Sequence, residues 1–260
     1  MSSLAPTDRL VLGCAGGHRF DVNKRGFVSL LPPRTRVRGD DAPMLRERAA
    51  FLDAGHYAPI ADAVADLAHR AAPATPRIVD IGCGTGYYLR ELSTAVAASA
   101  VLATDLSPDA VRMAMRTIPS SSGVVMDVWQ PLPLRDGAAD LILNVFAPRN
   151  PTEFARVLTA GGCYIGVVPT ARHLIELRDA GLALDVPADK RGTVATALES
   201  TGQFEPPVSK RVELPLALSP SEIRQLIGMG PSSHHGAART DDELPERVTV
   251  SVDVMAAQRV

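Results

Sequence analysis

From residue 78 onward, short apolar runs alternate with segments whose apolar residues recur at helical spacing. Five runs have the length and β-branched content of buried strands: IVDIG (78–82), AVLATD (100–105), GVVMD (123–127), ADLILNVF (139–146) and CYIGVV (163–168). Helices are predicted between them at 88–96, 107–117 and 151–158. Strands that alternate with helices form a parallel sheet with helices on both faces, so the pattern predicts an α/β fold.

The last third of the chain departs from this alternation. Two longer strands, KRVELPLAL (210–218) and VTVSVDVMA (248–256), flank a helix predicted over 220–229. Such a pair suits an antiparallel edge. We therefore expect a mostly parallel seven-stranded sheet with an antiparallel edge.

The first 58 residues have a different pattern. Short β-prone pieces such as FVSLL are broken by Gly, Pro and Arg, and a helix is predicted over 43–54. A second helix, 60–70, ends at the linker AAPATPR. We expect a small N-terminal substrate-recognition module at 1–58 and a catalytic domain at 59–260.

Composition adds two constraints. The net charge of −2 over 260 residues argues against a globally basic nucleic-acid binder. Between residues 19 and 38, however, a single acid is outnumbered by six basic residues, which we predict to contact RNA phosphates: Arg19, Lys24, Arg25, Arg34, Arg36 and Arg38.

Cysteine usage and hydropathy indicate the compartment. Cys14, Cys83 and Cys163 are an odd number at wide spacings, and no hydrophobic leader precedes them. This favours a reducing, cytoplasmic setting without a membrane partner.

The strongest chemical signal is VDIGCGTGYYL (79–89), an apolar strand that enters a glycine-rich turn and then a helix. Glycines allow the backbone to approach a ligand closely, and the helix N-terminus offers free N–H groups. Asp105 ends the next strand, nineteen residues after Gly86, and Asp127 ends the third. Three strand ends therefore converge on one crevice.

The G-x-G-x-G spacing, with Asp80 two residues before Gly82, is typical of the S-adenosylmethionine loop of class I (Rossmann-like) methyltransferases. The predicted cofactor-binding residues are Tyr57, Asp80, Gly82, Cys83, Gly84, Gly86, Asp105, Leu106, Asp127, Val128 and Asn144. The alternative is a plain strand-to-helix turn with solvated acids, which requires several independent features to coincide. We interpret Cys83 as a small packing residue, not as a nucleophile.

Five motifs together resemble one family. They are GDDAPMLRERAAFLDAGHYAP (39–59), DIGCGTGYY (80–88), LNVFAPRNPTEF (143–154), RVLTAGGCYIGVVP (156–169) and MGPSSHH (229–235). Over nearly the whole chain, the sequence resembles the 23S rRNA guanine-N1 methyltransferases, most closely the macrolide-resistance type of antibiotic-producing actinobacteria. The resemblance implies S-adenosylmethionine as cofactor, a 23S rRNA hairpin as partner and a tendency to form a homodimer.

The resemblance also implies an N-terminal zinc site of four ligands, of which only Cys14 and His18 are present here. Structural zinc needs four protein ligands, so we expect no bound zinc. Cys14 is then expected to be a buried free thiol. We favour core packing over base stacking for Phe20 and Phe27.

We predict that two catalytic residues, Asn144 and Phe146, lie at the end of the fourth strand and contact the acceptor. Asn144 could contact the guanine edge, or it could cap the turn before Pro148. Phe146 could stack on the base or pack beneath the loop, and the sequence leaves both open.

Four histidines outside the N-terminal module receive assignments. We expect His234 and His235 to lie on a substrate-facing loop. We interpret His69 and His173 as solvated. His56 and Tyr57 could close over the methionine end of the cofactor.

Two other functions remain open at this level. A small-molecule N- or O-methyltransferase of a biosynthetic pathway is favoured by the missing zinc ligands and opposed by the retained GDD, GHY and NVFAPRN segments. A non-catalytic S-adenosylmethionine-binding protein is disfavoured by the intact loop and Asp105.

Overall fold

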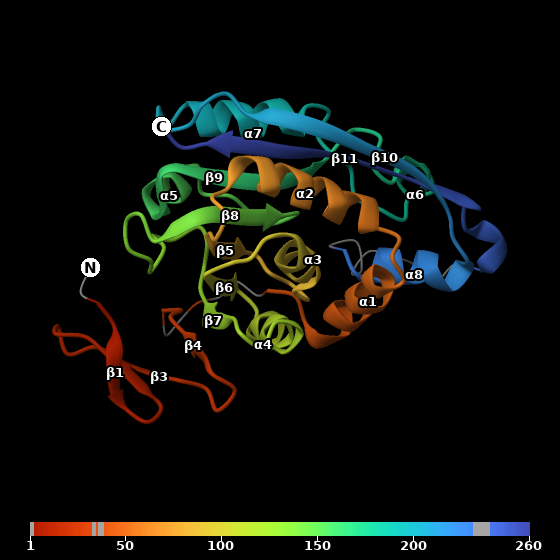
Figure 1. The fold of residues 1–260 in the computed structure, drawn as a ribbon. Coiled ribbons are helices and arrows are strands. Elements are labelled where there is room, and N and C mark those ends of the chain that lie inside the picture. The colour runs from red at the N-terminus through yellow and green to blue at the C-terminus, as the bar shows by residue number, and fades with distance from the viewer. Residues whose placement is uncertain (1–2, 33–34, 36–38, 231–239) are drawn as a thin grey trace.

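The structure, a computed structural model, describes residues 3–32, 35, 39–230 and 240–260. Its main sheet has the strand order β10-β11-β9-β8-β5-β6-β7-β4 (Figure 1). The strands are β4 (Phe27–Ser29), β5 (Arg77–Ile81), β6 (Ala100–Asp105), β7 (Ser122–Val125), β8 (Ala139–Val145), β9 (Leu158–Pro169), β10 (Val208–Ala217) and β11 (Arg247–Gln258).

The strands from β9 to β4 are parallel, whereas β11 runs antiparallel to both β9 and β10. The predicted α/β class, the mostly parallel sheet and its antiparallel edge are therefore confirmed.

The expected count of seven strands was wrong, because β4 adds an eighth. It comes from the N-terminal segment and pairs in parallel with β7, with Phe27 opposite Gly123. Phe27 and Val28 are buried there. A Cβ at position 123 would lie 3.0 Å from the Cβ of Phe27, so the glycine allows this close pairing.

Helices cover both faces of the sheet. They are α1 (Ala42–Asp53), α2 (Ala58–Ala71), α3 (Tyr87–Ala95), α4 (Pro108–Thr117), α5 (Pro151–Val157), α6 (Ile175–Asp179), α7 (Lys190–Glu199) and α8 (Pro220–Gly228), followed by the short 3₁₀-helix η2 (Asp241–Glu243). Buried residues of α2, α3, α4 and α8 share one core cluster, and those of α5 and α7 belong to the other. Among the described helices, none is both long and apolar enough to pass through a lipid bilayer.

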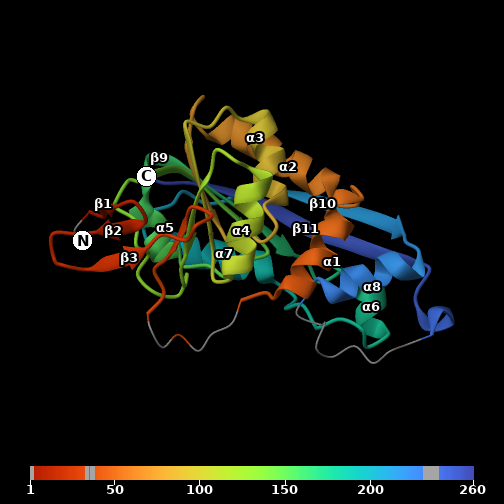
Figure 2. The same cartoon turned by 90° about the horizontal axis from the view of Figure 1, so that it is seen from below.

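The N-terminal segment contributes to two places. β1 (Ala5–Asp8), β2 (Val11–Gly13) and β3 (Arg19–Asp21) form a separate antiparallel sheet. Figures 1 and 2 show this small sheet standing apart from the body, at the opposite end from α8. β4 and α1 pack on the body instead, with Leu45 and Phe51 fully buried. The domain boundary at residue 58 stays a prediction.

An ion pair joins the two central strands that carry the site. Arg77, at the start of β5, donates from Nε and Nη2 to the two carboxylate oxygens of Asp140 in β8, at 2.9 Å each. The backbone N–H of Arg77 donates to the same carboxylate at 2.9 Å. These bonds lower the pKa of Asp140 to about 2, with the Arg77 side chain as the main cause.

We predict that Asp140→Asn lowers the free energy of unfolding at pH 7 by about 1 kcal/mol, a value kept small because the Arg77 side chain is 43% exposed. The folded carboxyl has a pKa below its unfolded value. Its contribution is therefore complete above a pH of about 4 and is lost as the pH falls toward 2. Urea unfolding from pH 7 to pH 2 measures this difference, with the exposed Asp62→Asn as control. A difference that stays constant over this range would contradict the assignment.

Candidate functional site

A cavity of about 1000 Å³ opens at the carboxyl ends of β5, β6, β7 and β8. Binding sites of drug-sized ligands typically occupy about 300–1,000 Å³, so this cavity can hold a cofactor together with part of an acceptor. The glycine loop and Asp105 line one part. Segments that follow β8 and β9 line the other.

The glycine loop packs closely against neighbouring segments, which its glycines allow. Gly82 has a φ of +81°, and a Cβ there would lie 2.4 Å from the Cβ of Ala147. Gly86 begins α3 with a φ of +81°, and a Cβ there would lie 2.7 Å from the Cα of Ala114. Both positions require glycine for conformation and for space.

Asp105 fixes the loop from the end of β6. Its carboxylate accepts hydrogen bonds from the backbone N–H groups of Gly84 (3.0 Å) and Ser107 (2.9 Å). Burial raises the pKa of Asp105, and these two bonds act against the increase. Each oxygen keeps a free lone pair, so the carboxylate can still accept from the hydroxyls of a bound ribose.

Asp80 lies below the loop and is 3% exposed. No described residue donates a hydrogen bond to its carboxylate. Burial and then the charge of Asp105 raise the pKa of Asp80 well above its usual range. A buried carboxylate without a donor is costly, so this group favours a cationic or donating ligand. Burial also raises the pKa of the Cys83 thiol, which fits a packing role.

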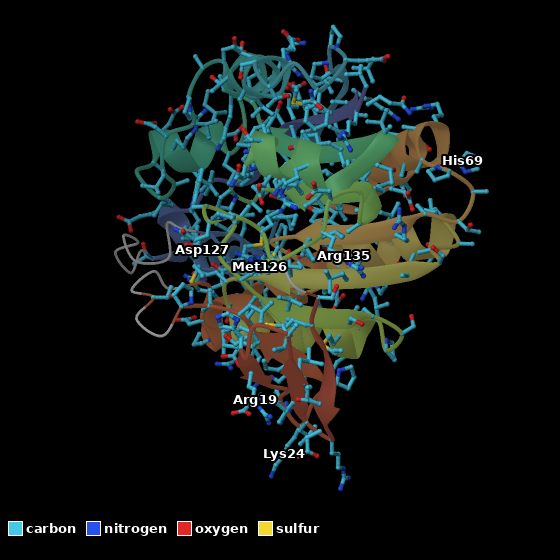
Figure 3. All side chains as sticks on the ribbon, turned by 90° about the vertical axis from the view of Figure 1, so that its left-hand side faces the viewer. Arg19, Lys24, His69, Met126, Asp127 and Arg135 are labelled. Atoms are coloured by element: carbon cyan, nitrogen blue, oxygen red, sulfur yellow. The ribbon has the colours of Figure 1, made fainter. Side chains whose placement is uncertain are left out.

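The end of β7 forms a third wall. The Asp127 carboxylate accepts from the backbone N–H of Trp129 at 3.0 Å, and the Val128 carbonyl accepts from Asn150 at 3.0 Å. The Val128 N–H has no acceptor among the described residues, so it remains available to a ligand. Leu106 also lines the cavity. Figure 3 shows Asp127 beside Met126 on the body of the molecule.

Asn144 is not brought into the cavity, contrary to the catalytic and cofactor-binding expectation. It is 0% exposed, and its amide donates to the carbonyls of Ile81 (3.1 Å) and Pro148 (3.0 Å). One hydrogen bond therefore holds the turn that ends at Pro148, and the other ties β8 to the end of β5. The geometry supports the structural alternative for this residue.

Phe146 follows directly and does line the cavity. Its backbone adopts a φ of +53°, which is rare for a non-glycine residue, and its side chain is 40% exposed. Three rings surround it, with centroids 6.4 Å away for Tyr57 and Tyr88 and 5.9 Å for His173. Strained backbone of this kind often occurs at functional sites.

His173 is buried, so the expectation that it is solvated was wrong. It stacks on Phe146 with an interplanar angle of 27°. Burial lowers the pKa of His173 to about 4. His56 lies elsewhere, where its Nε2 pairs with Glu222 at 2.8 Å. His69 is exposed, as predicted.

Sequence reasoning missed several polar residues that line the cavity, among them Arg48, Tyr88, Arg149 and Lys190. Arg48 of α1 donates to Asp40 and to the Met229 carbonyl. The buried Tyr88 hydroxyl has no partner. Arg48, Tyr88 and Arg149 fall within the recognised motifs, but Lys190 lies outside all of them.

Three basic residues before β4, namely Arg19, Lys24 and Arg25, do not line this cavity. Arg19, Lys24 and Arg25 are exposed, and Figure 3 shows Arg19 and Lys24 on the small N-terminal sheet, projecting away from the body. Arg34, Arg36, Arg38, His234 and His235 lie outside the described residues.

Cys14 and His18, the two residues that match the zinc site implied by the resemblance, form a hydrogen-bonded pair. The Sγ of Cys14 lies 3.3 Å from Nδ1 of His18, and this bond lowers the pKa of the thiol. Cys14 is partly exposed, so the expected burial was wrong. Within the ranges that the structure describes, no group of three or more His, Cys, Asp or Glu side chains could hold a metal ion.

Of the two N-terminal phenylalanines, Phe27 is buried in the core, as predicted. Phe20 is partly exposed.

Comparison with known proteins shows which proteins this chain is similar to. Residues 78–162 match the family model "Methyltransferase domain". A 23S rRNA (guanine(748)-N(1))-methyltransferase of Streptomyces fradiae is 43% identical over 247 residues, covering 94% of this chain and 86% of the relative. A Micromonospora griseorubida protein, provisionally named as a 23S rRNA (guanine-N(1)-)-methyltransferase, is 40% identical over 94% of this chain and 85% of its own length.

Among solved structures, the YcgJ protein of Bacillus subtilis shares the fold. The two align with a TM-score of 0.55 at 17% identity, over 76% of this chain and 97% of that one.

We predict that Asp105→Asn weakens the binding of S-adenosylhomocysteine by roughly 10- to 100-fold, because a hydrogen bond to a charged group contributes about 1.5–3 kcal/mol. Asparagine keeps the shape but can present only one accepting oxygen. Isothermal titration calorimetry measures the change, with Asp109→Asn in the first turn of α4, outside the cavity lining, as the control. An unchanged Kd would exclude Asp105 from the cofactor site.

Proposed function

Because the chain belongs to the family of 23S rRNA (guanine-N1)-methyltransferases, we propose that it methylates N1 of one guanine in a 23S rRNA hairpin near the tunnel where macrolides bind. The observation that carries this proposal is the 43% identity over 94% of the chain. The structure supports it with a three-walled crevice for the cofactor and an exposed aromatic ring, Phe146, beside it.

The residues of the crevice fit S-adenosylmethionine. The unpartnered, buried Asp80 suits the ammonium of the methionine moiety, and Asp105 suits the ribose hydroxyls. The free Val128 N–H and the Asp127 carboxylate suit an adenine edge. When bound, the cofactor supplies an activated methyl group to the acceptor. The protein aligns the acceptor and excludes water.

Phe146 is proposed to stack on the flipped guanine. Sequence-specific recognition of RNA usually splays single-stranded bases onto aromatic side chains. Phe146 presents its ring at the mouth of the apolar cavity and is held there by an αL backbone. The ring of His173, whose centroid lies 5.9 Å from that of Phe146, packs beside it and helps to hold its orientation.

The N-terminal module is proposed to grip the hairpin by charge. Arg19, Lys24 and Arg25 are exposed on or beside the β1–β3 sheet and have no acidic partner among the described residues. We propose that this module, residues 1–58, works without zinc. Cytoplasmic action and a homodimer remain predictions of the sequence.

We expect purified protein with labelled S-adenosylmethionine to transfer label to unmodified 23S rRNA and to create one reverse-transcription stop, because a methyl on guanine N1 blocks base pairing. The control is rRNA that already carries the modification. Protein that binds the cofactor but leaves all rRNA unlabelled would refute the proposal and favour a small-molecule acceptor.

A variant with Arg19, Lys24 and Arg25 all changed to Gln should bind the hairpin more weakly. Its plot of log K against log salt should flatten by about 0.7–0.9 per lost phosphate contact. Filter binding from low to high salt measures this slope. The matched control changes the exposed residues Arg70, Lys210 and Arg247 to Gln. Equal slopes for both triple variants would show that the N-terminal sheet does not touch phosphates.

A further inference from the structure

Beyond Phe146, the cavity continues into a region built by the segment after β8 and the segments around α6 and α7. His173, Leu177, Lys190 and Val194 line this region together with Arg149. These residues come from segments that follow β8 and β9, and they are separate from the glycine loop and Asp105, which we assign to the cofactor. The polar groups of this region therefore bear on the acceptor rather than on the cofactor.

His173 enters this region as a hydrogen-bond donor. Its Nδ1 accepts a hydrogen bond from the backbone N–H of Ser251 at 3.3 Å. The imidazole is neutral near pH 7, because burial lowers the pKa of His173 to about 4. A neutral ring that accepts at Nδ1 carries its proton on Nε2. His173 can therefore donate to a carbonyl such as guanine O6, but it cannot accept the N1 proton.

Arg149 is a fixed cation in the same region. Its Nε donates to the hydroxyl of Tyr164 at 3.1 Å, and its Nη2 donates to the carbonyl of Val167 at 3.1 Å. No carboxylate of the described residues pairs with it. Its positive charge therefore acts on its neighbours without neutralisation.

Lys190 is close enough to Arg149 to be affected by its positive charge. It is the first residue of α7, where the helix dipole also disfavours a cation. Burial and then Arg149 lower the pKa of Lys190. The side chain has no hydrogen-bond or ion-pair partner among the described residues, although the acids Asp185 and Asp189 lie nearby in the chain and Asp185 also lines the cavity.

Four other ionisable groups at the cavity are unsuited to accept this proton. Burial raises the pKa of both Tyr57 and Tyr88, so these phenols stay protonated. Asp80 belongs to the cofactor wall. Asp185 is exposed, and a carboxylate is a much weaker base than an amine.

We propose that Lys190 is the catalytic residue that accepts the N1 proton of the acceptor guanine, in a subsite where Phe146 stacks on the base and His173 donates to O6. This inference rests on the proposed function. The N1–H bond gives its proton to the neutral Lys190 amine and leaves its electron pair on N1. That pair forms the bond to the methyl carbon, as the methyl–sulfur pair returns to sulfur and Lys190 becomes an ammonium.

The first test compares single-turnover methylation of 23S rRNA by the wild type, Lys190→Met, Lys190→Arg and the matched control Arg191→Met. Arg191 is the exposed next residue of α7. Lys190→Met should lose about 10²- to 10⁴-fold in rate, the usual contribution of a general base. Lys190→Arg should stay equally slow, because a guanidinium cannot deprotonate. Arg191→Met should match the wild type.

The pH profile gives a second signature. The wild-type rate should rise with pH and level off below the pH at which an ordinary lysine loses its proton, because the pKa of Lys190 is lowered. The rate of Lys190→Met should keep rising to a pH of about 9, where the guanine ionises without help. Full activity of Lys190→Arg would overturn the base assignment and leave Lys190 as a positioning cation.

A binding measurement separates failure of this inference from failure of the proposed function. Calorimetry with guanosine 5′-monophosphate, in the presence of S-adenosylhomocysteine, tests the subsite without rRNA. Loss of binding in Lys190→Met but not in Arg191→Met supports a guanine subsite even if the wild type methylates no rRNA. The inference is overturned if Lys190→Met and Arg191→Met bind the nucleotide equally and also methylate rRNA equally. It is likewise overturned if the two bind equally and the wild type methylates no rRNA.

Discussion

The site depends on one constraint, which is that the parallel strands β5, β6, β7 and β8 all end at the same edge of the sheet. Every wall of the crevice begins at one of these ends. The register between β5 and β8 is therefore important, and three hydrogen bonds between Arg77 and Asp140 hold the other ends of these two strands together. A slip by one residue would turn every side chain of a strand to the opposite face.

Within this frame, the crevice places two carboxyl groups close together, those of Asp80 and Asp105. Burial raises the pKa of both groups, and the charge of Asp105 further raises the pKa of Asp80. Their carboxylates are arranged for a ligand that brings a cation and hydroxyl groups. The acceptor region has the opposite character, with Arg149 and Lys190 beside a neutral imidazole. In the proposed function, one cavity thus combines an acidic cofactor half with a basic acceptor half, and Phe146 lines the same cavity.

Most of the residues that the sequence assigned to the cofactor line one cavity, and their sequence signatures are local. Most of them lie at strand ends or in a glycine turn, and both features have short-range signatures in apolar pattern and spacing. β4 was missed as a strand of the main sheet because three residues are too short for a periodic signal. α6 and α7 were missed because few of their residues are buried, which leaves almost no apolar stripe. Asn144 was misassigned because a polar residue at a strand end has the same sequence signature whether it faces a ligand or caps a turn. His173 is buried because it packs against β11, where the backbone N–H of Ser251 donates to it. No local sequence pattern predicts such a long-range contact.

The difference between the two halves has a consequence for specificity. The acceptor half draws Arg149, His173 and Lys190 from three segments that only the fold brings together, and none of them is required by the glycine loop. Substitutions there can change the acceptor while the cofactor site stays intact, which is why the methyltransferase fold alone, at 17% identity, does not identify a substrate. Phe146 is the exception, because its strained backbone follows β8 immediately and its ring has neighbours from both halves, namely Tyr57, Tyr88 and His173. In the proposed function, Phe146 is therefore the position at which the local geometry of a strand end and the long-range packing of the fold together align the acceptor.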